Sequence, residues 1–564
     1  MFNNRKMIGL LVLVAVFATG AAAIDYVQAS GRGTSLQQWG VLNKITSLVR
    51  DNYVEEVDQE KLLDGAIEGM LTRLDPHSTY ISPENSKRVQ ERFEGEFEGI
   101  GIHFDVINGV LTVMSPIPGS PAYAVGLRAG DKIVKIDGKS ALGIKESQVM
   151  ERLKGPKGTK VRVTVSREGE ENPLEFTITR DKIEISSVQP AFMIRPDVGY
   201  IWITRFSRKT AEEFDEALEN LKREGMKKLI LNLRNNGGGY LDQAVQIVDR
   251  FIDKGQMIVY TRGRKPNSSE EHYAQRGTEH PLYPVIVMVN SASASASEIV
   301  AGALQDHDRA LIVGQTSFGK GLVQNKFELQ NGGSVLLTVA RYYTPSGRLI
   351  QRPYTEDRMA YIEGAGRDRI VGEEPDASLT DSSKTAQRSG ETTKRPVYYT
   401  MNRKRRVYGG GGIAPDVALR PDTLNALERR LDRENILFDF ANRYASAHRS
   451  ELNDLGRFIA GFELSRRDLA DIRRVIEERG IAVREEEFQA GLDFIRRVIM
   501  QEIAVSRWGQ EAQYQVNASL DPEVHQALNL FDQAEQLVAD RNGEDAPGAA
   551  SRRGRAGEEV GRIR

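Results

Sequence analysis

The sequence predicts a multidomain protein with an α/β core, a smaller β-rich module upstream of that core, and helical segments at both ends. From residue 198 to residue 313, apolar strand-like runs alternate with helical spacing, which is typical of an α/β layered core. Between residues 95 and 182, period-two alternation with Gly and Pro punctuation predicts short strands instead. The length of 564 residues and the 40% apolar content are sufficient for several such domains.

Residues 1–24 have the layout of a secretory signal. Arg5 and Lys6 precede an apolar segment that ends in the three alanines at residues 21–23. We expect cleavage after Ala23, with an uncleaved single membrane anchor as the alternative. Either outcome predicts a protein outside the cytoplasm, in a bacterial periplasm or cell envelope, that is soluble after cleavage or singly anchored.

Composition excludes several classes of function. The chain contains no cysteine, so disulfides, thiol catalysis and cysteine-based metal sites are excluded. A formal net charge of −2 gives no electrostatic footprint for nucleic acid, and we expect no nucleic-acid partner.

A helical segment is predicted over residues 36–90, followed by the β-rich module at residues 91–185. The helical spacing is carried by Leu42, Ile45, Leu48, Val49, Leu62, Ala66, Met70 and Leu71. Within the module, strands are predicted at residues 99–104, 110–113, 131–138 and 161–166.

The α/β core is assigned to residues 186–420. Its predicted strands are residues 198–204, 228–233, 257–260, 285–289 and 310–313, with helices at 210–223, 240–251 and up to 306. Residues 355–397 are rich in Gly, Ser, Thr, Asp and Arg and have almost no apolar periodicity. We interpret this segment as a mobile insertion that leaves the core sheet intact, with a regulatory or recognition loop as the alternative.

Four alternating serines connect the strand at residues 285–289 to the next helix: Ser291, Ser293, Ser295 and Ser297. A serine hydroxyl needs a base within hydrogen-bond reach and donors for the oxyanion that forms. A strand-to-helix junction provides such donors, because backbone N–H groups and the helix dipole face developing negative charge. Alternating Ala and Ser is also typical of a flexible linker, but a linker is not normally bracketed by a strand and a helix.

Lys320 is a candidate base for a serine. The seven histidines lie in unrelated contexts, and the chain has no Gly-x-Ser-x-Gly motif. A lysine can replace histidine if it is neutral, which requires its pKa to fall from about 10.4 to near 7, or about 4 kcal/mol, through burial. Lys320 lies in a Gly-Lys-Gly turn that leads to the strand-like residues 322–329, and this turn can aim the amine inward.

Five ordered motifs resemble those of the C-terminal processing peptidases, also called tail-specific proteases, which are serine peptidases with a Ser/Lys dyad. The motifs are residues 233–240, 290–306, 314–324, 341–348 and 410–416. The resemblance implies Ser295 as the nucleophile, Lys320 as the base, and Gln324 as the residue that helps hold the lysine. It also implies a crotonase-like βαβ spiral for the core, and neither a cofactor nor a metal ion.

The resemblance further implies an oxyanion hole formed by the Ala296 N–H and by a backbone N–H of the triple-glycine turn, from Gly237 or Gly238. Glycine suits that position, because a side chain would obstruct the approach of the scissile carbonyl. Alternatively, residues 235–239 only cap the preceding strand and begin the next helix, and both interpretations can hold together.

Residues 120–134 look like the helix, turn and strand of a PDZ domain, which adds a peptide to its sheet edge and captures the terminal carboxylate. The carboxylate-binding loop would be Gly99, Ile100, Gly101 and Ile102, where the glycines leave backbone amides exposed. The alternative is that these glycines only turn the chain.

Amphipathic helical patterns fill residues 421–540, and residues 541–564 are predicted to be disordered. The helices either cap the core or, with the N-terminal helices, form a homo-oligomer or adaptor surface.

The resulting hypothesis is a serine endopeptidase that recognises C-terminal tails of exported proteins through its PDZ domain and cleaves them through an acyl-enzyme. A non-catalytic tail-binding scaffold is the alternative, but it has no chemical reason to keep Ser295, Lys320, Gln324 and the glycine turn together.

Overall fold

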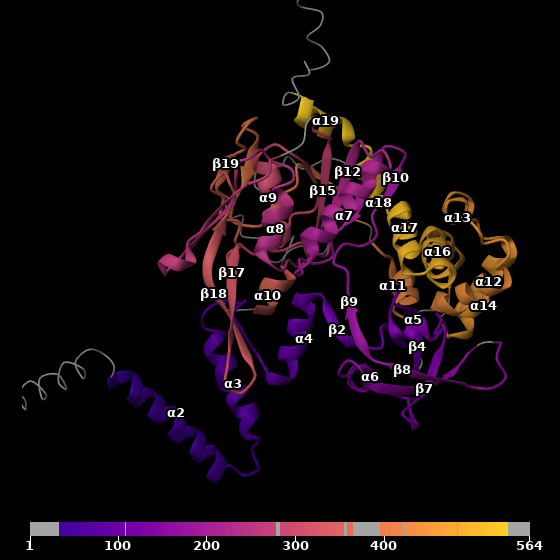
Figure 1. Cartoon of the computed structure of the whole chain (residues 1–564), viewed down its shortest axis with the longest axis horizontal. Coiled ribbons are helices and arrows are strands. Elements are labelled where there is room, and N and C mark those ends of the chain that lie inside the picture. The colour runs from indigo at the N-terminus through magenta and orange to yellow at the C-terminus, as the bar shows by residue number, and fades with distance from the viewer. Residues whose placement is uncertain are drawn as a thin grey trace, which may run out of the picture. The chain divides into compact units, whose positions relative to one another are not determined.

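The computed structural model describes residues 33–107, 109–167, 169–277, 282–354, 358–364, 395–421, 423–434, 436–481 and 483–539. The chain forms two compact units, Met1–Ser82 and Pro83–Arg564 (Figure 1). The predicted signal or anchor at residues 1–24 and the predicted disordered tail at residues 541–564 lie outside the described residues.

The first unit contains the helices α2 (Gly33–Asn52) and α3 (Gln59–Leu71) and the short strand β1 (Thr79–Ile81). Asp58 begins α3, because its carboxylate accepts the Glu60 N–H at 3.0 Å and satisfies a helix-end donor. Helix α2 leaves Trp39, Ile45 and Leu48 exposed. None of the helices in the described ranges combines the length and apolar character that crossing a bilayer requires.

The second unit begins with α4 (Pro83–Glu94) and the β-rich module. The strands of the module are β2 (Glu96–Gly99), β3 (Ile102–Ile107), β4 (Val110–Pro116), β5 (Lys132–Ile136), β6 (Lys139–Ser140), β7 (Lys160–Ser166), β8 (Leu174–Thr179) and β9 (Asp181–Glu184). Its helices are α5 (Pro121–Ala124) and α6 (Glu146–Leu153). The main sheet has the order β3-β4-β5-β7-β8, with β6 on β5, while β2 pairs with β9.

One predicted strand of the module is divided in the structure. Instead of a single strand over residues 99–104, Ile100 and Gly101 separate β2 from β3. Gly101 has φ +79°, and a Cβ there would lie 2.3 Å from the Ser120 Cβ. The left-handed turn and the close approach of α5 therefore interrupt the strand at a glycine.

The core sheet has the order β10-β11-β12-β15-β16-β21, and β11, β12, β15, β16 and β21 are parallel. These strands are β10 (Phe192–Arg195), β11 (Val198–Trp202), β12 (Lys228–Asn232), β15 (Val285–Val289), β16 (Leu311–Gly314) and β21 (Val417–Ala418). The intervening helices are α7 (Thr210–Arg223), α8 (Leu241–Val248) and α9 (Ala296–Asp306). The alternation predicted for the α/β core is confirmed, with ends that differ by a few residues, except that the predicted strand at residues 257–260 belongs to a different, antiparallel sheet.

Both faces of this sheet are covered, which explains why its strands are continuous apolar runs. Leu229 and Leu231 belong to the core that contains residues of α7, α8 and α9. Ile230, between them, points to the opposite face and belongs to a core with Val524 and Phe531 near the end of the chain. The C-terminal helices α18 (Pro522–Leu528) and α19 (Phe531–Ala539) therefore cover the second face (Figure 1).

The remaining C-terminal helices share a core of their own that extends from Leu427 to Val516. They are α11 (Ala426–Arg433), α12 (Ile436–Ala447), α13 (Leu455–Gly461), α14 (Arg466–Glu478), α15 (Glu485–Ala490), α16 (Leu492–Trp508) and α17 (Gln510–Leu520). Helix α17 leads directly into α18, so the helical region is joined to the sheet by packing as well as by the chain.

A second sheet lies beside the core. It contains β13 (Met257–Gly263), β14 (Glu271–Tyr273), β17 (Leu322–Glu328) and β18 (Ser334–Tyr343), with the short helix η2 (Pro266–Ser268) after β13. Strands β17 and β18 form a long antiparallel hairpin. A further small pair consists of β19 (Val397–Tyr399) and β20 (Arg406–Tyr408).

The predicted mobile insertion contains an ordered helix, which corrects part of that expectation. Helix α10 (Arg358–Glu363) lies within residues 355–397, and its Tyr361 is only 5% exposed. The Tyr361 ring contacts Phe318 edge-on, with ring centroids 5.7 Å apart, and lies under the Arg352 guanidinium at 4.4 Å. This helix is held by one buried aromatic side chain. Because a single apolar residue produces no periodic pattern, the sequence did not predict the helix. Residues 365–394 lie outside the described residues.

Candidate active site

The candidate site is built from three loops that follow adjacent parallel strands. The glycine turn (residues 234–239) follows β12, the serine loop (residues 290–295) follows β15, and the lysine loop (residues 315–321) follows β16. Because the carboxyl ends of parallel strands meet at one edge of a sheet, the topology brings these loops together.

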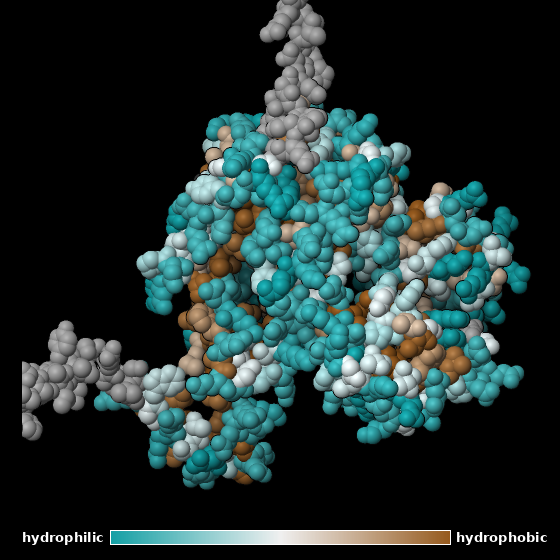
Figure 2. All heavy atoms as spheres, in the orientation of Figure 1, coloured by the Kyte–Doolittle hydropathy of each residue, from teal (hydrophilic) through white to brown (hydrophobic). Residues whose placement is uncertain are grey.

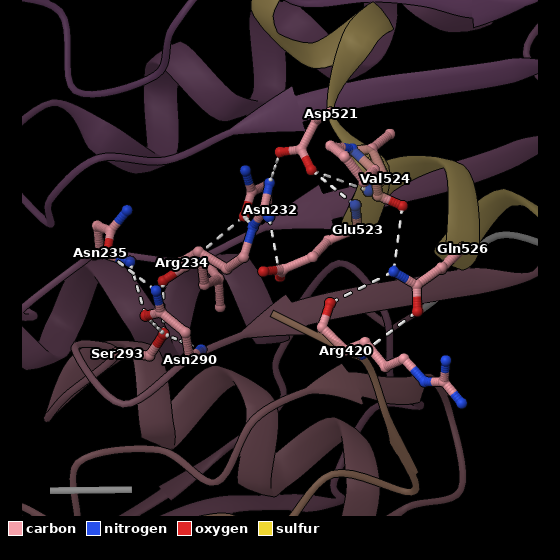
Figure 3. Close-up of polar contacts among 12 residues, drawn as sticks. Asn232, Arg234, Asn235, Asn290, Ser293, Arg420, Asp521, Glu523, Val524 and Gln526 are labelled. Atoms are coloured by element: carbon pink, nitrogen blue, oxygen red, sulfur yellow. Dashed lines mark hydrogen bonds and ion pairs between the residues drawn. The ribbon is translucent and has the colours of Figure 1, made fainter. Parts of the chain in front are cut away.

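Hydrogen bonds join the glycine turn to the serine loop. Asn235 and Asn290 exchange two of them, from the Asn235 N–H to Asn290 Oδ1 at 3.0 Å and from Asn290 Nδ2 to Asn235 Oδ1 at 2.9 Å (Figure 3). The Ala294 N–H donates to the Asn236 carbonyl at 3.0 Å. The two loops therefore form one rigid surface beside α9.

The serine run divides into structural and accessible hydroxyls. Ser293 and Ser297 are buried, and their hydroxyls donate to the carbonyls of Leu233 and Asn236, each at 2.8 Å. Ser291 and Ser295 are partly exposed. The Ser295 hydroxyl makes no hydrogen bond with any described residue, and Ser295 directly precedes α9. The Ala/Ser run is therefore an ordered loop in this structure, and the linker interpretation is wrong.

Ser295 has a backbone conformation that is rare for residues other than glycine, with φ +56° and ψ −113°. Such a conformation costs about 1–3 kcal/mol and persists only where the surroundings enforce it. Here the Tyr342 hydroxyl donates to the Ser295 carbonyl at 3.1 Å, and the Ser295 N–H donates to Glu298 Oε2 at 2.8 Å. The next N–H, that of Ala296, is the first of α9 and makes no hydrogen bond among the described residues, as expected of a helix N-terminus.

Glu298 connects the serine loop to the lysine loop. Its carboxylate is fully buried and accepts four hydrogen bonds, which come from the Ser295 and Lys320 N–H groups on Oε2 and from the Ser317 hydroxyl and Gly319 N–H on Oε1. The Ser295 and Lys320 backbone nitrogens thus lie within 2.9 Å of one oxygen atom. Burial raises the pKa of Glu298, and the four donors oppose that change because they favour the ionised form.

Glu298 is a residue of the site that was not predicted, although the sequence contains a signal for it. Glu298 stands three residues after Ser295 at the start of a helix, which is the Ser-x-x-Glu spacing of a capping box. In a capping box the glutamate side chain accepts the N-cap N–H, and Glu298 makes that hydrogen bond. The connection to Lys320 had no counterpart in local sequence.

Lys320 is half-buried, and its amine donates to Gln324 Oε1 at 2.6 Å, as the resemblance implied for these two residues. Gln324 lies in β17 at a register shift of the β17–β18 hairpin. Bulges of this kind re-aim side chains next to active sites. The shared Glu298 oxygen brings the backbones of Lys320 and Ser295 together, and the Ser295/Lys320 dyad stays a prediction.

The two glycines proposed as oxyanion donors differ in their surroundings. The Gly238 N–H donates to Asn236 Oδ1 at 2.9 Å, whereas the Gly237 N–H makes no hydrogen bond among the described residues. Gly238 has φ +96°, and a Cβ there would lie 2.7 Å from the Ser295 Cβ. A Cβ on Gly237 would meet no atom within 4 Å. Gly238 is therefore required for close packing on Ser295, and the Gly237 N–H is the one that can donate a hydrogen bond to a substrate oxygen.

The predicted carboxylate-binding loop is a separate site in the β-rich module. Gly99 ends β2 and Ile102 begins β3, while the Ile100 side chain is buried in the core of the module. The Ile100 carbonyl accepts the Ala122 N–H of α5 at 2.9 Å, which fixes the loop against that helix. Among the described residues no hydrogen bond or ion pair connects this loop to the three loops of the core. The described residues also contain no group of three His, Cys, Asp or Glu placed to hold a metal ion.

Four regions of the chain match known protein families. Residues 197–360 match peptidase family S41, and residues 112–167 match the PDZ domain. Residues 18–85 match the N-terminal domain of the activating protease CtpB, and residues 427–509 match a family of unknown function.

Individual relatives agree with these matches. The chain is 40% identical over 351 residues to the carboxy-terminal-processing protease of Bartonella bacilliformis, covering 62% of this chain and 80% of that protein. It is 37% identical over 360 residues to the carboxy-terminal processing protease CtpA of Bacillus subtilis, covering 62% and 76%. Among solved structures it is similar to the photosystem II D1 C-terminal processing protease, at 28% identity and a TM-score of 0.31, covering 57% and 90%.

Proposed function

The chain belongs to peptidase family S41 and is a serine-type peptidase with a PDZ domain, and on this premise we propose that Ser295 and Lys320 are its catalytic dyad. We propose further that the substrates are exported proteins held by their free C-terminal tails. The observation that carries the dyad is the strained, accessible Ser295 at the start of α9, whose backbone shares one Glu298 oxygen with the backbone of Lys320.

In the proposed reaction the Ser295 hydroxyl oxygen attacks the scissile carbonyl carbon, and its proton passes to the neutral Lys320 amine. The tetrahedral oxyanion accepts hydrogen bonds from the Ala296 and Gly237 N–H groups. Collapse of this intermediate breaks the C–N bond, and Lys320 returns the proton to the leaving amine. Lys320 then takes a proton from water, and the hydroxide attacks the carbonyl carbon of the ester. The C–O bond to Ser295 breaks, the acyl group leaves as a carboxylic acid, and Lys320 returns the proton to the Ser295 oxygen.

This reaction requires the Lys320 amine to lie within hydrogen-bond reach of the Ser295 hydroxyl in the substrate complex. In the structure the amine donates a hydrogen bond to Gln324. Catalytic hydrogen bonds are often absent without substrate and form in the bound complex. We therefore assign Gln324 the role of holding the lysine close to its working position.

The surroundings of the site support a peptide substrate with apolar residues. Strand β17 begins two residues after Lys320, and Phe327 on that strand is exposed. Figure 2 shows hydrophobic residues gathered over β17 and β18 on an otherwise largely hydrophilic face. An extended apolar segment bound along this hairpin would lead to the lysine loop.

The location and the partners of the proposed enzyme rest on the sequence. The predicted secretory signal or anchor at residues 1–24 supports exported substrates. An adaptor protein, and self-association through the N- or C-terminal helices, stay predictions.

Replacement of Ser295 or Lys320 by alanine is expected to abolish cleavage of an unfolded protein with an apolar C-terminal tail. Neither side chain fills a core, so the circular dichroism spectrum should match that of the parent. Cleavage is followed by mass spectrometry of the products. Ser291→Ala, in the same run, is a matched control that should keep the parental rate. Parental cleavage by Ser295→Ala or Lys320→Ala would contradict the dyad.

A further inference from the structure

Arg234 opens the glycine turn and is held from the far end of the chain. Its side chain is only 12% exposed. The guanidinium donates to Asp521 Oδ2 at 2.5 Å and to Glu523 Oε2 at 3.0 Å. These carboxylates lie 287 and 289 residues further along the chain, at the junction between α17 and α18.

The near side of Arg234 is fixed by its own strand. Asn232 ends β12, and its Oδ1 accepts both the Arg234 N–H at 3.0 Å and the Arg234 Nε–H at 3.1 Å. Asn232 Nδ2 in turn donates to the buried Tyr200 hydroxyl at 2.7 Å. Hydrogen bonds thus hold the guanidinium between the end of a core strand and the C-terminal helices.

The two carboxylates are themselves rigidly placed. Asp521 begins α18, where its Oδ1 accepts the N–H groups of Glu523 at 2.8 Å and Val524 at 3.3 Å. The Val524 side chain is fully buried in the core on the second face of the sheet. Because packed interiors resist deformation, the packing of Val524 fixes the position of Asp521, and Asp521 in turn fixes the position of the Arg234 guanidinium.

The glycine turn follows Arg234 immediately. The next residue, Asn235, is bound to Asn290 of the serine loop, and Gly237 and Gly238 follow two positions later. A carbonyl in this turn, that of Asn236, accepts the Ser297 hydroxyl of α9. A displacement of Arg234 would therefore be passed to the Gly237 N–H and to the loop that carries Ser295.

We propose that Asp521 and Glu523 are positioning residues for the oxyanion side of the active site, so that the C-terminal helices complete the catalytic machinery. The inference rests on the proposed function, because it assumes that the glycine turn stabilises the oxyanion. The carboxylates do not touch the substrate. They act through Arg234, which sets the place of the turn relative to Ser295.

The test is the double variant Asp521→Asn with Glu523→Gln, which keeps the shapes and removes both charges. Misplacement of a catalytic group by about 1 Å and loss of one oxyanion donor each lower the rate by about 100-fold or more. We expect kcat to fall by about 10–100-fold while KM stays within about threefold, since tail binding is remote. Amide hydrogen exchange of residues 234–239 should become faster.

A matched control lies on the same strand. Lys228 at the start of β12 pairs with Glu535 of α19 at 2.6 Å, so Glu535→Gln removes another ion pair between this strand and the C-terminal helices. That pair lies at the opposite end of β12 from the glycine turn, and it is more exposed. Glu535→Gln should leave kcat and the exchange of residues 234–239 unchanged.

A second route keeps the proposal falsifiable if the double variant folds poorly. The single variant Glu523→Gln leaves Asp521 in place and is expected to show a smaller fall in kcat, with the same faster exchange at residues 234–239. In an Arg234→Gln background, Glu523→Gln should add little further loss, because both changes remove one contact. Additive losses in that background would overturn the inference.

Ser295→Ala, assayed alongside, distinguishes a failure of the proposed catalytic dyad from a failure of the positioning role of Asp521 and Glu523. If Ser295→Ala still cleaves, the proposed function fails. If Ser295→Ala is inactive while folded Asp521 and Glu523 variants match the parent in kcat and in exchange, only the positioning role is overturned.

Discussion

Ser295 takes a left-handed backbone conformation that is unusual for a residue with a side chain, and three neighbours enforce it. Glu298 binds its N–H, Tyr342 binds its carbonyl, and Gly238 packs against its Cβ. The consequence is an accessible hydroxyl at the start of α9, between buried serines whose hydroxyls are already bonded. At this scale the chemistry depends on which groups have no hydrogen-bond partner among the described residues: the Ser295 hydroxyl and the N–H groups of Ala296 and Gly237.

The two glycines should respond differently to the addition of one methyl group. Gly238→Ala would place a Cβ 2.7 Å from the Ser295 Cβ and 2.8 Å from the Ala294 carbonyl oxygen, at a φ of +96°. We expect kcat to fall at least about 100-fold, because the nucleophile must shift. Gly237→Ala meets no atom within 4 Å and keeps its N–H, so activity within about tenfold of the parent is expected. Steady-state cleavage rates measure both, and greater loss in Gly237→Ala would contradict the assignment.

At the scale of elements, the apolar pattern of the sequence sets where helices and strands lie. The pKa values of their polar side chains depend instead on what the elements pack against. Helix α16 illustrates this, because its buried apolar side chains belong to the separate core of the C-terminal helices and it also carries Glu502. Glu502 Oε2 is buried and makes no hydrogen bond with a described residue. Burial raises the pKa of Glu502 to about 7.

This shift predicts a pH dependence of stability. An unfolded glutamate loses its proton near pH 4.5, whereas the folded protein keeps the Glu502 proton up to about pH 7. Between these values the folded state binds more protons, so the free energy of unfolding falls as pH rises, by roughly 3 kcal/mol in all. Glu502→Gln removes this loss. Its melting temperature should equal that of the parent at pH 4.5 and exceed it at pH 8, as measured by calorimetry.

The exposed Glu511 on α17 provides the control. The difference in melting temperature between Glu511→Gln and the parent should be the same at every pH. A Glu502→Gln variant whose advantage does not grow between pH 4.5 and pH 8 would contradict the prediction.

At the scale of the whole molecule, the PDZ domain, the S41 core and the C-terminal helices confirm the predicted fold class. Several contacts link these parts within the second unit. Strand β4 of the PDZ domain contacts the first residue of α17 through the Ser115 hydroxyl and Gln510 Oε1, at 3.1 Å. The other end of α17 leads to Asp521, which binds Arg234 beside the glycine turn. One helix thus contacts both the proposed tail-binding domain and the proposed catalytic core.

Tail recognition should depend on a free C-terminal carboxylate. A peptide with an apolar tail is expected to bind Ser295→Ala protein at least about tenfold more tightly than the same peptide ending in an amide, because backbone N–H groups of a PDZ loop bind the charged group. Isothermal titration calorimetry measures the two affinities. An N-acetylated peptide with a free carboxylate should bind like the parent peptide. Equal affinity for acid and amide would exclude carboxylate capture at Gly99 to Ile102.

The sequence by itself determined the order and type of the core elements. Strand β15 is apolar throughout, and β12 is apolar from Leu229 to Leu231, because both faces of these strands are buried, and that pattern is local. It also located Ser295, Lys320 and Gln324 as candidates, through chemistry and resemblance; their roles stay predictions.

Only the tertiary structure decided what holds these residues. The Glu298 carboxylate joins two loops separated by a helix and a strand, and Asp521 meets Arg234 across 287 residues. The burial of Tyr361 on Phe318 is likewise a single long-range contact. Such contacts arise where strands and helices from distant parts of the chain meet, and they leave no period in the sequence, because each involves only one or two side chains.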